Sequence, residues 1–264
     1  AQESWPQRPV GMLVPWAPGG SNDIVARLLS PQFEQRAGQP FVVENRPGGG
    51  GSIGMGVAMR ARADGHSLFV SSASNHVFHP LISGELGYDV REAFEGIAMW
   101  VDVPNVVVVN PSVPARTLPE LLELVRRTRG GMSFGSSGVG SSNHLAGELL
   151  RLRTGLELTH IPYRGGGPAL SLRPDLPTVM EAGVPDYAVR SWTGLFTPRG
   201  TPPAVIRRAS ELSREALGAP AVAARLREIG SEAIWMDPQR TDAFVREEYA
   251  RWAPIIRQAN VKIE

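Results

Sequence analysis

Residues 13–29, LVPWAPGGSNDIVARLL, run from an apolar strand through paired glycines into an apolar-periodic helix. Gly19, Gly20 and Ser21 stand where the strand ends and the helix begins. The first N–H groups of a helix have no partner within it and lie at the positive end of its dipole. Glycines let a ligand approach the backbone, so a carboxylate or phosphate would bind there without a basic side chain. The alternative is an ordinary turn with Ser21 as the N-cap.

Strand and helix patterns alternate on either side of this joint, an order typical of a parallel sheet covered by helices. The strand patterns lie at 10–16, 40–46, 66–73, 132–138 and 156–163. The helix patterns lie at 21–37, about 52–62, 117–128, 142–153, 202–217, 220–229 and 238–259. Asp23 is expected to complement the dipole of the first helix and to pair with Arg27, four residues on.

Two long β-prone stretches, 96–111 and 188–198, are long enough to carry the chain out of one lobe and back again. The sequence therefore predicts a two-lobed α/β fold whose hinge is made of two crossing strands. Lobe 1 is expected to hold residues 1–103 and 197–264, and lobe 2 residues 104–196. The loops at the carboxyl ends of the strands would then face a cleft between the lobes.

Composition excludes several classes of function. The chain has 27 basic and 26 acidic side chains and a net charge of +1, which gives no reason to expect nucleic acid or an acidic membrane as partner. No run of eighteen apolar residues is present to span a bilayer. The absence of cysteine excludes disulfides, a thiol nucleophile and cysteine-bound metals. The polar start, AQESWPQRPV, is read as a mature N-terminus after signal cleavage.

Two further loops are candidates for the same site: 135–149 repeats the design of the first, and SSASNHVF, 71–78, follows the third strand on the same side of the sheet as the first. GSSGVGSSNHLAGEL, 135–149, passes from a strand through small residues into a helix that begins near Ser141 or Ser142. Two such helix ends, one per lobe, could hold one anion from both sides. The side-chain donors available in these two further loops are Ser136, Ser137, Ser141, Asn143, Ser72, Ser74 and Asn75. A plain polar loop at 71–78, and a structural hydrogen bond for His144, remain as alternatives.

Motifs of other chemistries fail on their context. GGGSIG, 49–54, fits a dinucleotide-binding pattern, but the next strand ends without the acidic residue that would hold a ribose. GMSFG, 131–135, places Ser133 at the start of a strand, where a nucleophile elbow needs it at the end. His76 and His79 are two ligands only, too few for zinc. We therefore expect no catalytic residue, no metal and no cofactor.

Several stretches resemble the Bug proteins, the extracytoplasmic receptors of tripartite tricarboxylate transporters. They include VPWAPGGSNDIVAR (14–27), VENRPGGGGSIG (43–54), FGSSGVGSSNHLAGEL (134–149), HIPYRGGGPAL (160–170) and SWTGLFTPRGTP (191–202). The resemblance covers nearly the whole chain in order. It implies a type II periplasmic-binding-protein fold, a periplasmic location, no catalysis and a carboxylate ligand. It also implies a monomer that docks on membrane transporter subunits.

The resemblance places the ligand on the two loops already singled out. Together with the residue-based candidates, the expected ligand contacts are Trp16, Pro18, Gly19, Gly20, Ser21, Ser72, Ser74, Asn75, Ser137, Gly138, Gly140, Ser141, His144 and Arg164. One departure is abrupt: the family has several tens of residues where Ser171 here follows Leu170 at once. We expect that a segment belonging between these two residues is absent from the sequence rather than naturally deleted.

The sequence predicts a receptor that closes on a small organic acid, most of all a dicarboxylate. A sensor with the same fold is one alternative, which sequence does not separate from transport. A hydrolase that uses the same cleft is the other, disfavoured because no base and nucleophile occur in a known order.

Overall fold

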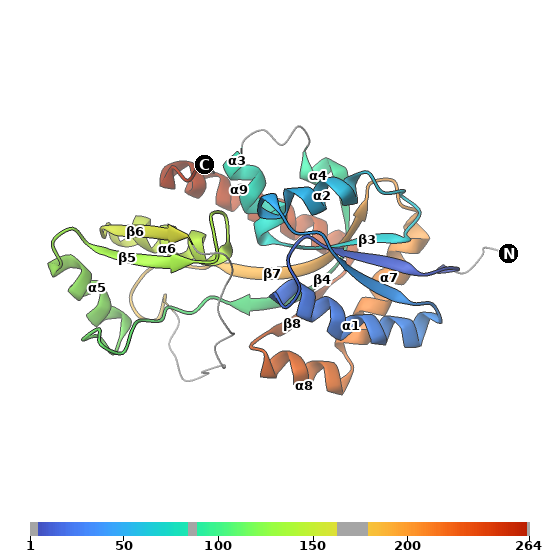
Figure 1. The fold of residues 1–264 in the computed structure, drawn as a ribbon, viewed down its shortest axis with the longest axis horizontal. Coiled ribbons are helices and arrows are strands. Elements are labelled where there is room, and N and C mark those ends of the chain that lie inside the picture. Colours follow the sequence, from blue (N-terminus) through green and yellow to red (C-terminus); the bar gives the residue numbers. More distant parts are fainter. Residues whose placement is uncertain (1–4, 84–88, 163–178, 263–264) are drawn as a thin grey trace.

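The computed structural model describes residues 5–83, 89–162 and 179–262. Its strands form a six-stranded sheet and a two-stranded sheet, at opposite ends of the view in Figure 1. The strands are β1 (Val10–Val14), β2 (Phe41–Asn45), β3 (Ser67–Ser72), β4 (Phe94–Pro104), β5 (Met132–Ser136), β6 (Leu158–Pro162), β7 (Arg190–Pro198) and β8 (Glu232–Met236). The helices are α1 (Ser21–Ala37), α2 (Ser52–Met59), α3 (His79–Ser83), α4 (Val90–Ala93), α5 (Leu118–Arg127), α6 (Ser142–Thr154), α7 (Pro203–Leu217), α8 (Pro220–Glu228) and α9 (Pro238–Ala259). Two short helices complete them, η1 (Gly49–Gly51) and the π-helix η2 (Ser74–Phe78).

The six-stranded sheet has the order β2-β1-β3-β7-β4-β8. Strand β1 pairs in parallel with β2 and β3, which confirms the parallel arrangement expected from the alternating strands and helices. Strands β7, β4 and β8 run antiparallel to their neighbours. Strand β8 has no counterpart in the sequence prediction.

Helices cover both faces of this sheet (Figure 1). Helices α1, α7 and α8 pack on one face in a core that contains Leu29, Trp100 and Leu212. Helices α2 and α9 cover the other face, where Trp192 and Trp252 are buried. A third, smaller cluster lies at the two-stranded sheet β5-β6 and its helices. The α/β fold with a mixed sheet and helices is thus the one that the sequence predicts.

Strands β4 and β7 lead from the large sheet toward the small one (Figure 1). They pair antiparallel from Phe94 opposite Pro198 to Pro104 opposite Arg190. These are the two crossings that the sequence places in the hinge. The lobe boundaries, 1–103 with 197–264 and 104–196, stay a prediction.

Two local expectations are wrong. The strand pattern at 96–111 stops at Pro104, because proline has no N–H to continue the ladder. The valines at 106–109 lie outside any described strand and are 40–62% exposed. The strand predicted at 66–73 is confirmed as far as Ser72, but the residues after it, weighed as a loop within 71–78, form η2 instead.

Helix α1 has the predicted bounds. It begins at Ser21 and ends at Ala37, where Gly38 adopts φ 71° in the left-handed region. Val25, Leu29 and Phe33 are buried in the core. Ile24 is 38% exposed, because Asn22 and Asp23 take the buried positions of the first turn.

We expect Gly147→Ala to destabilise the fold by about 1–3 kcal/mol through overpacking. Gly147 in α6 lies so close to Phe134 of β5 that an added Cβ would overlap the ring. This cost exceeds the roughly 1 kcal/mol that alanine gains over glycine within a helix. Urea unfolding measures the difference. Adding Phe134→Leu removes the ring and should recover most of the loss. An unchanged stability in the single variant would show that α6 does not rest on β5.

Candidate functional site

The loop between β1 and α1 presents a helix N-terminus with no side chain over it. The N-cap is Gly20, at φ −75° and ψ 164°, and no side-chain hydrogen bond caps the helix. Pro18, Gly19, Gly20 and Ser21 are exposed. Gly19 adopts φ 85°, a conformation that favours glycine. The first N–H groups of α1 therefore have no side-chain cap at the positive end of its dipole.

The buried carboxylate of Asp23 fixes the loop between β1 and α1. Asp23 accepts hydrogen bonds from Gly19 N at 2.9 Å, Arg27 Nε at 3.0 Å and Asn45 Nδ2 at 2.9 Å. Burial alone would raise the pKa of Asp23, but the hydrogen bonds from Gly19, Arg27 and Asn45 outweigh it and lower that pKa. The ion pair with Arg27 is the one that the sequence predicts.

Trp16 is fixed beside the same loop by an amide. Its indole Nε1 donates to Asn75 Oδ1 at 2.9 Å, and Ser72 Oγ donates to the same oxygen at 3.2 Å. Asn75 Nδ2 in turn donates to Gly50 O at 3.1 Å. Asn75 is only 2% exposed. We therefore correct its expected role: Asn75 positions Trp16 rather than offering a free group to a ligand.

The loop between β5 and α6 is held by its own hydroxyl groups. Ser141 is the N-cap of α6, and its Oγ accepts from His144 N. Ser137 Oγ donates to Asn143 Oδ1 at 3.0 Å. Ser136 Oγ accepts from Gly138 N at 3.1 Å. The loop thus has a defined shape without a ligand, and Ser137, Gly138 and Ser141 remain partly exposed in it.

His144 does not point into solvent, contrary to the expectation that it contacts a ligand. It is 4% exposed, and its Nδ1 accepts the N–H of Gly140 at 3.1 Å. Its ring stacks on that of His160, with centroids 3.7 Å apart. The alternative reading, a structural hydrogen bond, describes it correctly.

Both helix N-termini attach to the same strand. Thr193 Oγ1 of β7 donates to Asn22 Oδ1 of α1 at 2.9 Å. Ser142 Oγ of α6 lies 3.1 Å from Ser191 Oγ of β7. Ser191 and Thr193 are two residues apart, so they lie on the same face of β7. The N-termini of α1 and α6 are therefore bonded to two residues of β7 that lie about 7 Å apart along the strand.

More polar groups gather around this part of β7. Ser72, at the end of β3, is paired with Thr193 across the sheet. Asn105, just after β4, accepts a hydrogen bond from Ser142 Oγ at 3.2 Å. The side-chain nitrogens of Asn22 and Asn105 are buried and have no hydrogen-bond partner in the described part of the chain. Buried donors without a partner are uncommon in folded proteins, so these two are candidate ligand contacts.

The structure thus brings together most of the residues predicted for the site. Trp16, Gly20, Ser21 and Ser72 lie on the side of α1 and β3, and the 137–141 loop lies on the side of α6. Ser74 begins η2 and is partly exposed. Arg164 and the joint between Leu170 and Ser171 fall outside the described residues.

Sequence reasoning missed Asn22, Asn105, Ser191 and Thr193. The alternation of Ser191 and Thr193 with Arg190 and Trp192 in a strand was the available signal, since alternate residues share a face. Their partners, Asn22 and Ser142, are distant in sequence, so the pattern within the strand did not by itself indicate a site.

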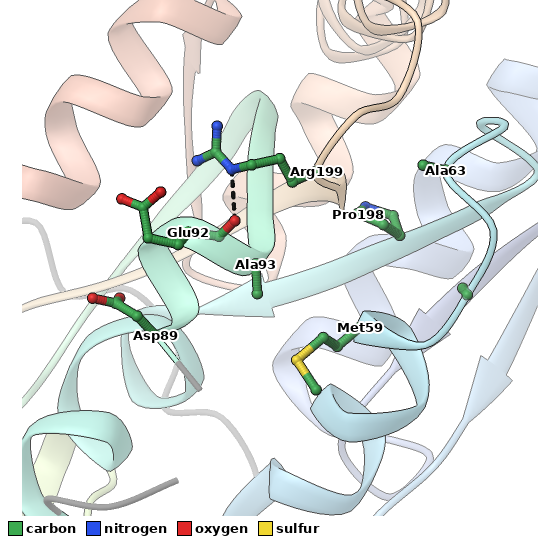
Figure 2. A pocket seen from close by; sticks show the side chains of 8 residues that line it. Met59, Ala63, Asp89, Glu92, Ala93, Pro198 and Arg199 are labelled. Atoms are coloured by element: carbon green, nitrogen blue, oxygen red, sulfur yellow. Dashed lines mark hydrogen bonds between the residues drawn. The ribbon is translucent and has the colours of Figure 1, made fainter. Parts of the chain in front are cut away.

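A cavity of about 400 Å³ lies elsewhere, beside α4 and the end of α2 (Figure 2). Its lining includes Met59, Pro198 and Arg199 with two acidic residues, Asp89 and Glu92. Arg199 is occupied, because its Nε donates to Glu92 O at 2.6 Å and its Nη2 to Arg91 O at 2.8 Å. Two carboxylates and an occupied guanidinium do not suit an anionic ligand, so the helix N-termini are the better candidate site.

The described residues contain no group of three or more histidine or acidic side chains placed to hold a metal ion. His76 is stacked on Phe196 with centroids 3.9 Å apart, and its Nδ1 is 2.7 Å from Ser71 Oγ. His79 Nδ1 is 3.3 Å from Ser83 Oγ. Both histidines of the H-x-x-H pattern therefore have structural partners. Among the described helices, none has the length and apolar character to cross a membrane.

Comparison with known proteins agrees with this architecture. The chain is 30% identical to the periplasmic binding protein BugD, with a TM-score of 0.85 over 98% of this chain and 100% of that one. A Rhodopseudomonas palustris protein, Rpa4515 with adipate, gives 30% identity and a TM-score of 0.88 over 98% of this chain and 99% of that one. MatC from the same organism, with bound malate, gives 27% identity and a TM-score of 0.82 over 96% of this chain and 100% of that one. The fold is therefore that of a periplasmic binding protein.

The sequence profile described as "Tripartite tricarboxylate transporter family receptor" matches residues 25–173 and 170–261. Protein BugT of Bordetella pertussis (strain Tohama I) is 32% identical over 305 positions, which cover 99% of this chain and 92% of BugT. The chain belongs to this receptor family. Since the alignment has 305 positions and the chain 264 residues, at least 41 positions have no residue here. The two matched parts meet at 170–173, the joint where the sequence predicts an absent segment.

We expect Asp23→Asn to lower the free energy of unfolding at pH 7 by about 1–3 kcal/mol, because three donors lose the charged acceptor that the buried Asp23 provides. The pKa of Asp23 is lower in the folded state than its ordinary 3.8. Its stabilisation is therefore present above about pH 4 and is lost as the pH falls through the folded-state value. Urea unfolding at pH 7 and pH 2.5 should show a gap between wild type and variant that closes in acid. Glu211→Gln, on the exposed surface of α7, should change little at either pH. A constant gap would contradict this role for the Asp23 charge.

Proposed function

We propose that this chain is a periplasmic receptor that binds a small dicarboxylate between the loops 16–21 and 136–141. On this proposal it acts as a monomer and delivers the acid to a tripartite tricarboxylate-type membrane transporter. The observation that carries the proposal is the attachment of two helix N-termini, at Asn22 and Ser142, to Thr193 and Ser191 on one face of β7.

The donors at this place suit an anion rather than a sugar or a cation. They are the first N–H groups of α1 and α6, the hydroxyl of Ser21, and the unpaired amide nitrogens of Asn22 and Asn105. The hydroxyls of Ser137 and Ser141 donate to Asn143 Oδ1 and would have to turn from it to reach the ligand. Asp23 is the one acidic residue of the 16–23 segment, and its carboxylate is already occupied by three donors. Helix N-termini bind carboxylates well without a cationic side chain.

The relatives support the choice of ligand class. Rpa4515 was solved with adipate and MatC with malate, and both are dicarboxylates. A ligand with two carboxylates matches two helix N-termini on opposite loops. We propose the same class for this chain, with one carboxylate on α1 and the other on α6.

A hydrolase is the second candidate, favoured by one observation. Ser136 Oγ lies 2.6 Å from His160 Nε2, a distance suited to a nucleophile and its base. Against it, Ser136 is buried and its hydroxyl is bound to both the N–H and the C=O of Gly138. The His160 ring stacks on another histidine, and the nearby Glu148 is paired with Arg151 at 2.8 Å. Turnover of p-nitrophenyl acetate that is abolished by Ser136→Ala would favour the hydrolase.

We expect Gly20→Val to weaken binding of adipate or malate at least tenfold, or about 1.4 kcal/mol. The backbone of Gly20 suits a β-branched residue, and an added Cβ would meet only Ala17 O at 3.5 Å. The fold should survive, while the side chain stands where the carboxylate approaches α1. Calorimetry with each acid and with its neutral diamide measures the effect, and Gly20→Ala gives the smaller step. Unchanged affinity in Gly20→Val, or equal binding of acid and diamide, would contradict the site.

We expect Trp16→Ala to weaken longer acids more than short ones. The indole is half-buried, held by Asn75, and forms an apolar wall beside the loop. Loss of the ring should reduce adipate affinity by more than malate affinity, because more of the adipate carbon chain loses apolar contact. Trp16→Phe keeps a ring without the hydrogen bond and should fall between the two. An equal loss for both acids would place the indole away from the ligand's carbon chain.

A further inference from the structure

Two imidazole rings lie stacked under the 136–141 loop. His144 comes from the first turn of α6 and His160 from β6, and their centroids are 3.7 Å apart with an angle of 18° between the planes. The Phe134 ring lies beside both, at 5.1 Å from His160 and 6.4 Å from His144. His144 is therefore packed within the protein, with the partly exposed His160 against it, and neither ring is among the ligand donors.

Each ring holds one end of the loop. His144 Nδ1 accepts the N–H of Gly140 at 3.1 Å, so this nitrogen carries no proton. His160 Nε2 lies 2.6 Å from Ser136 Oγ, and Ser136 is bonded to both backbone groups of Gly138. The bond that holds Gly140 therefore depends on an unprotonated His144 Nδ1, whereas the contact of His160 with Ser136 allows either ring nitrogen to carry the proton.

We propose that His144 and His160 form a pH-sensitive latch, which positions the 136–141 loop for its ligand and releases it when the pair takes up a proton. A proton on His144 Nδ1 would face the N–H of Gly140, donor against donor. Two protonated rings at this stacking distance would also repel each other. The effect of the latch on ligand binding rests on the proposed function, whereas the release of the loop on protonation does not.

The groups around the pair favour the neutral form at pH 7. Burial, together with the neighbouring His160, lowers the pKa of His144 from 6.5 to about 4. Burial also lowers the pKa of His160, against the opposing effect of the Glu148 charge. Glu148 is itself paired with Arg151. Tyr187 donates to Ala146 O of α6, and burial raises its pKa to about 12. Tyr187 therefore stays uncharged over the pH range in which His144 takes up a proton.

The direction of the pH effect follows from linkage. The latched loop has the lower pKa, so acid favours the released loop, in which His144 returns toward 6.5. The effect is absent at pH 7.5, grows as the pH falls below about 6.5, and levels off near 4. With a His144 pKa of 6.5 in the released loop and about 4 in the latched loop, acidification to pH 5 shifts the equilibrium toward the released loop by at most roughly 30-fold.

The first test uses the ligand-free protein, by NMR of the imidazole nitrogens and by hydrogen exchange of the Gly140 amide. We expect the protection factor of Gly140, corrected for intrinsic exchange, to fall at least threefold from pH 7 to pH 5. His144→Asn keeps an acceptor at the place of Nδ1 and takes up no proton, so its protection should not change with pH. The control His66→Gln, outside the loop, should behave as wild type. Constant protection of Gly140 in the wild type, or an equal fall in His144→Asn, would overturn the latch.

The second test measures adipate affinity by calorimetry at pH 7.5 and pH 5.0. Adipate takes up protons itself in this range, but this affects all variants equally. The loss of affinity on acidification should be at least threefold greater in wild type and His66→Gln than in His144→Asn. An equal loss in all three would overturn the control of binding by the latch. Absence of adipate binding at pH 7.5 would count against the proposed ligand, and the exchange measurement would still decide the latch.

Discussion

Two hydrogen bonds to one face of β7 organise the molecule around its candidate site. Thr193 binds Asn22 at the start of α1, and Ser191 binds Ser142 at the start of α6. Helix α1 packs on the large sheet, whereas α6 packs on the small sheet and also contacts α9, so these bonds tie both helix starts to a single strand. The positive ends of both helix dipoles are thus attached to β7, which is also one of the two strands that cross between the sheets. On the proposed function, ligand and hinge are therefore in direct contact.

A site made of neutral donors has a physical consequence. A hydrogen bond from a neutral donor to a charged group contributes about 1.5–3 kcal/mol at most, so several are needed to replace the water around a carboxylate. On the proposed function, the loops supply them through helix ends, hydroxyls and amides. Their shape depends on buried acceptors beneath them, Asp23 under the first and His144 under the second. One acceptor carries a charge at pH 7 and the other does not, and this asymmetry is the basis for expecting acid to act on the second loop first.

Much of this could be predicted from local pattern. The start of α1 at Ser21, the starts of α6 and α9, and the parallel β2-β1-β3 unit follow from strand and helix periodicity with glycine and proline stops. The contacts that complete the site did not follow. Thr193 with Asn22 and Trp16 with Asn75 are 171 and 59 residues apart in sequence, and neither residue type alone signals its partner. The π-helix after Ser72 arises where Asn75 and His76 turn inward to buried partners, which overrides their polar, loop-like character.

On the proposed function, the N-termini of α1 and α6 hold one dicarboxylate. A crystal structure with adipate or malate would show both ends of the ligand. We expect one carboxylate within hydrogen-bond distance, about 2.7–3.2 Å, of backbone nitrogens at the start of α1. The other carboxylate should contact the 137–141 loop, with the carbon chain beside Trp16. A ligand bound to only one of the two helices, or found in the cavity beside Arg199, would contradict it.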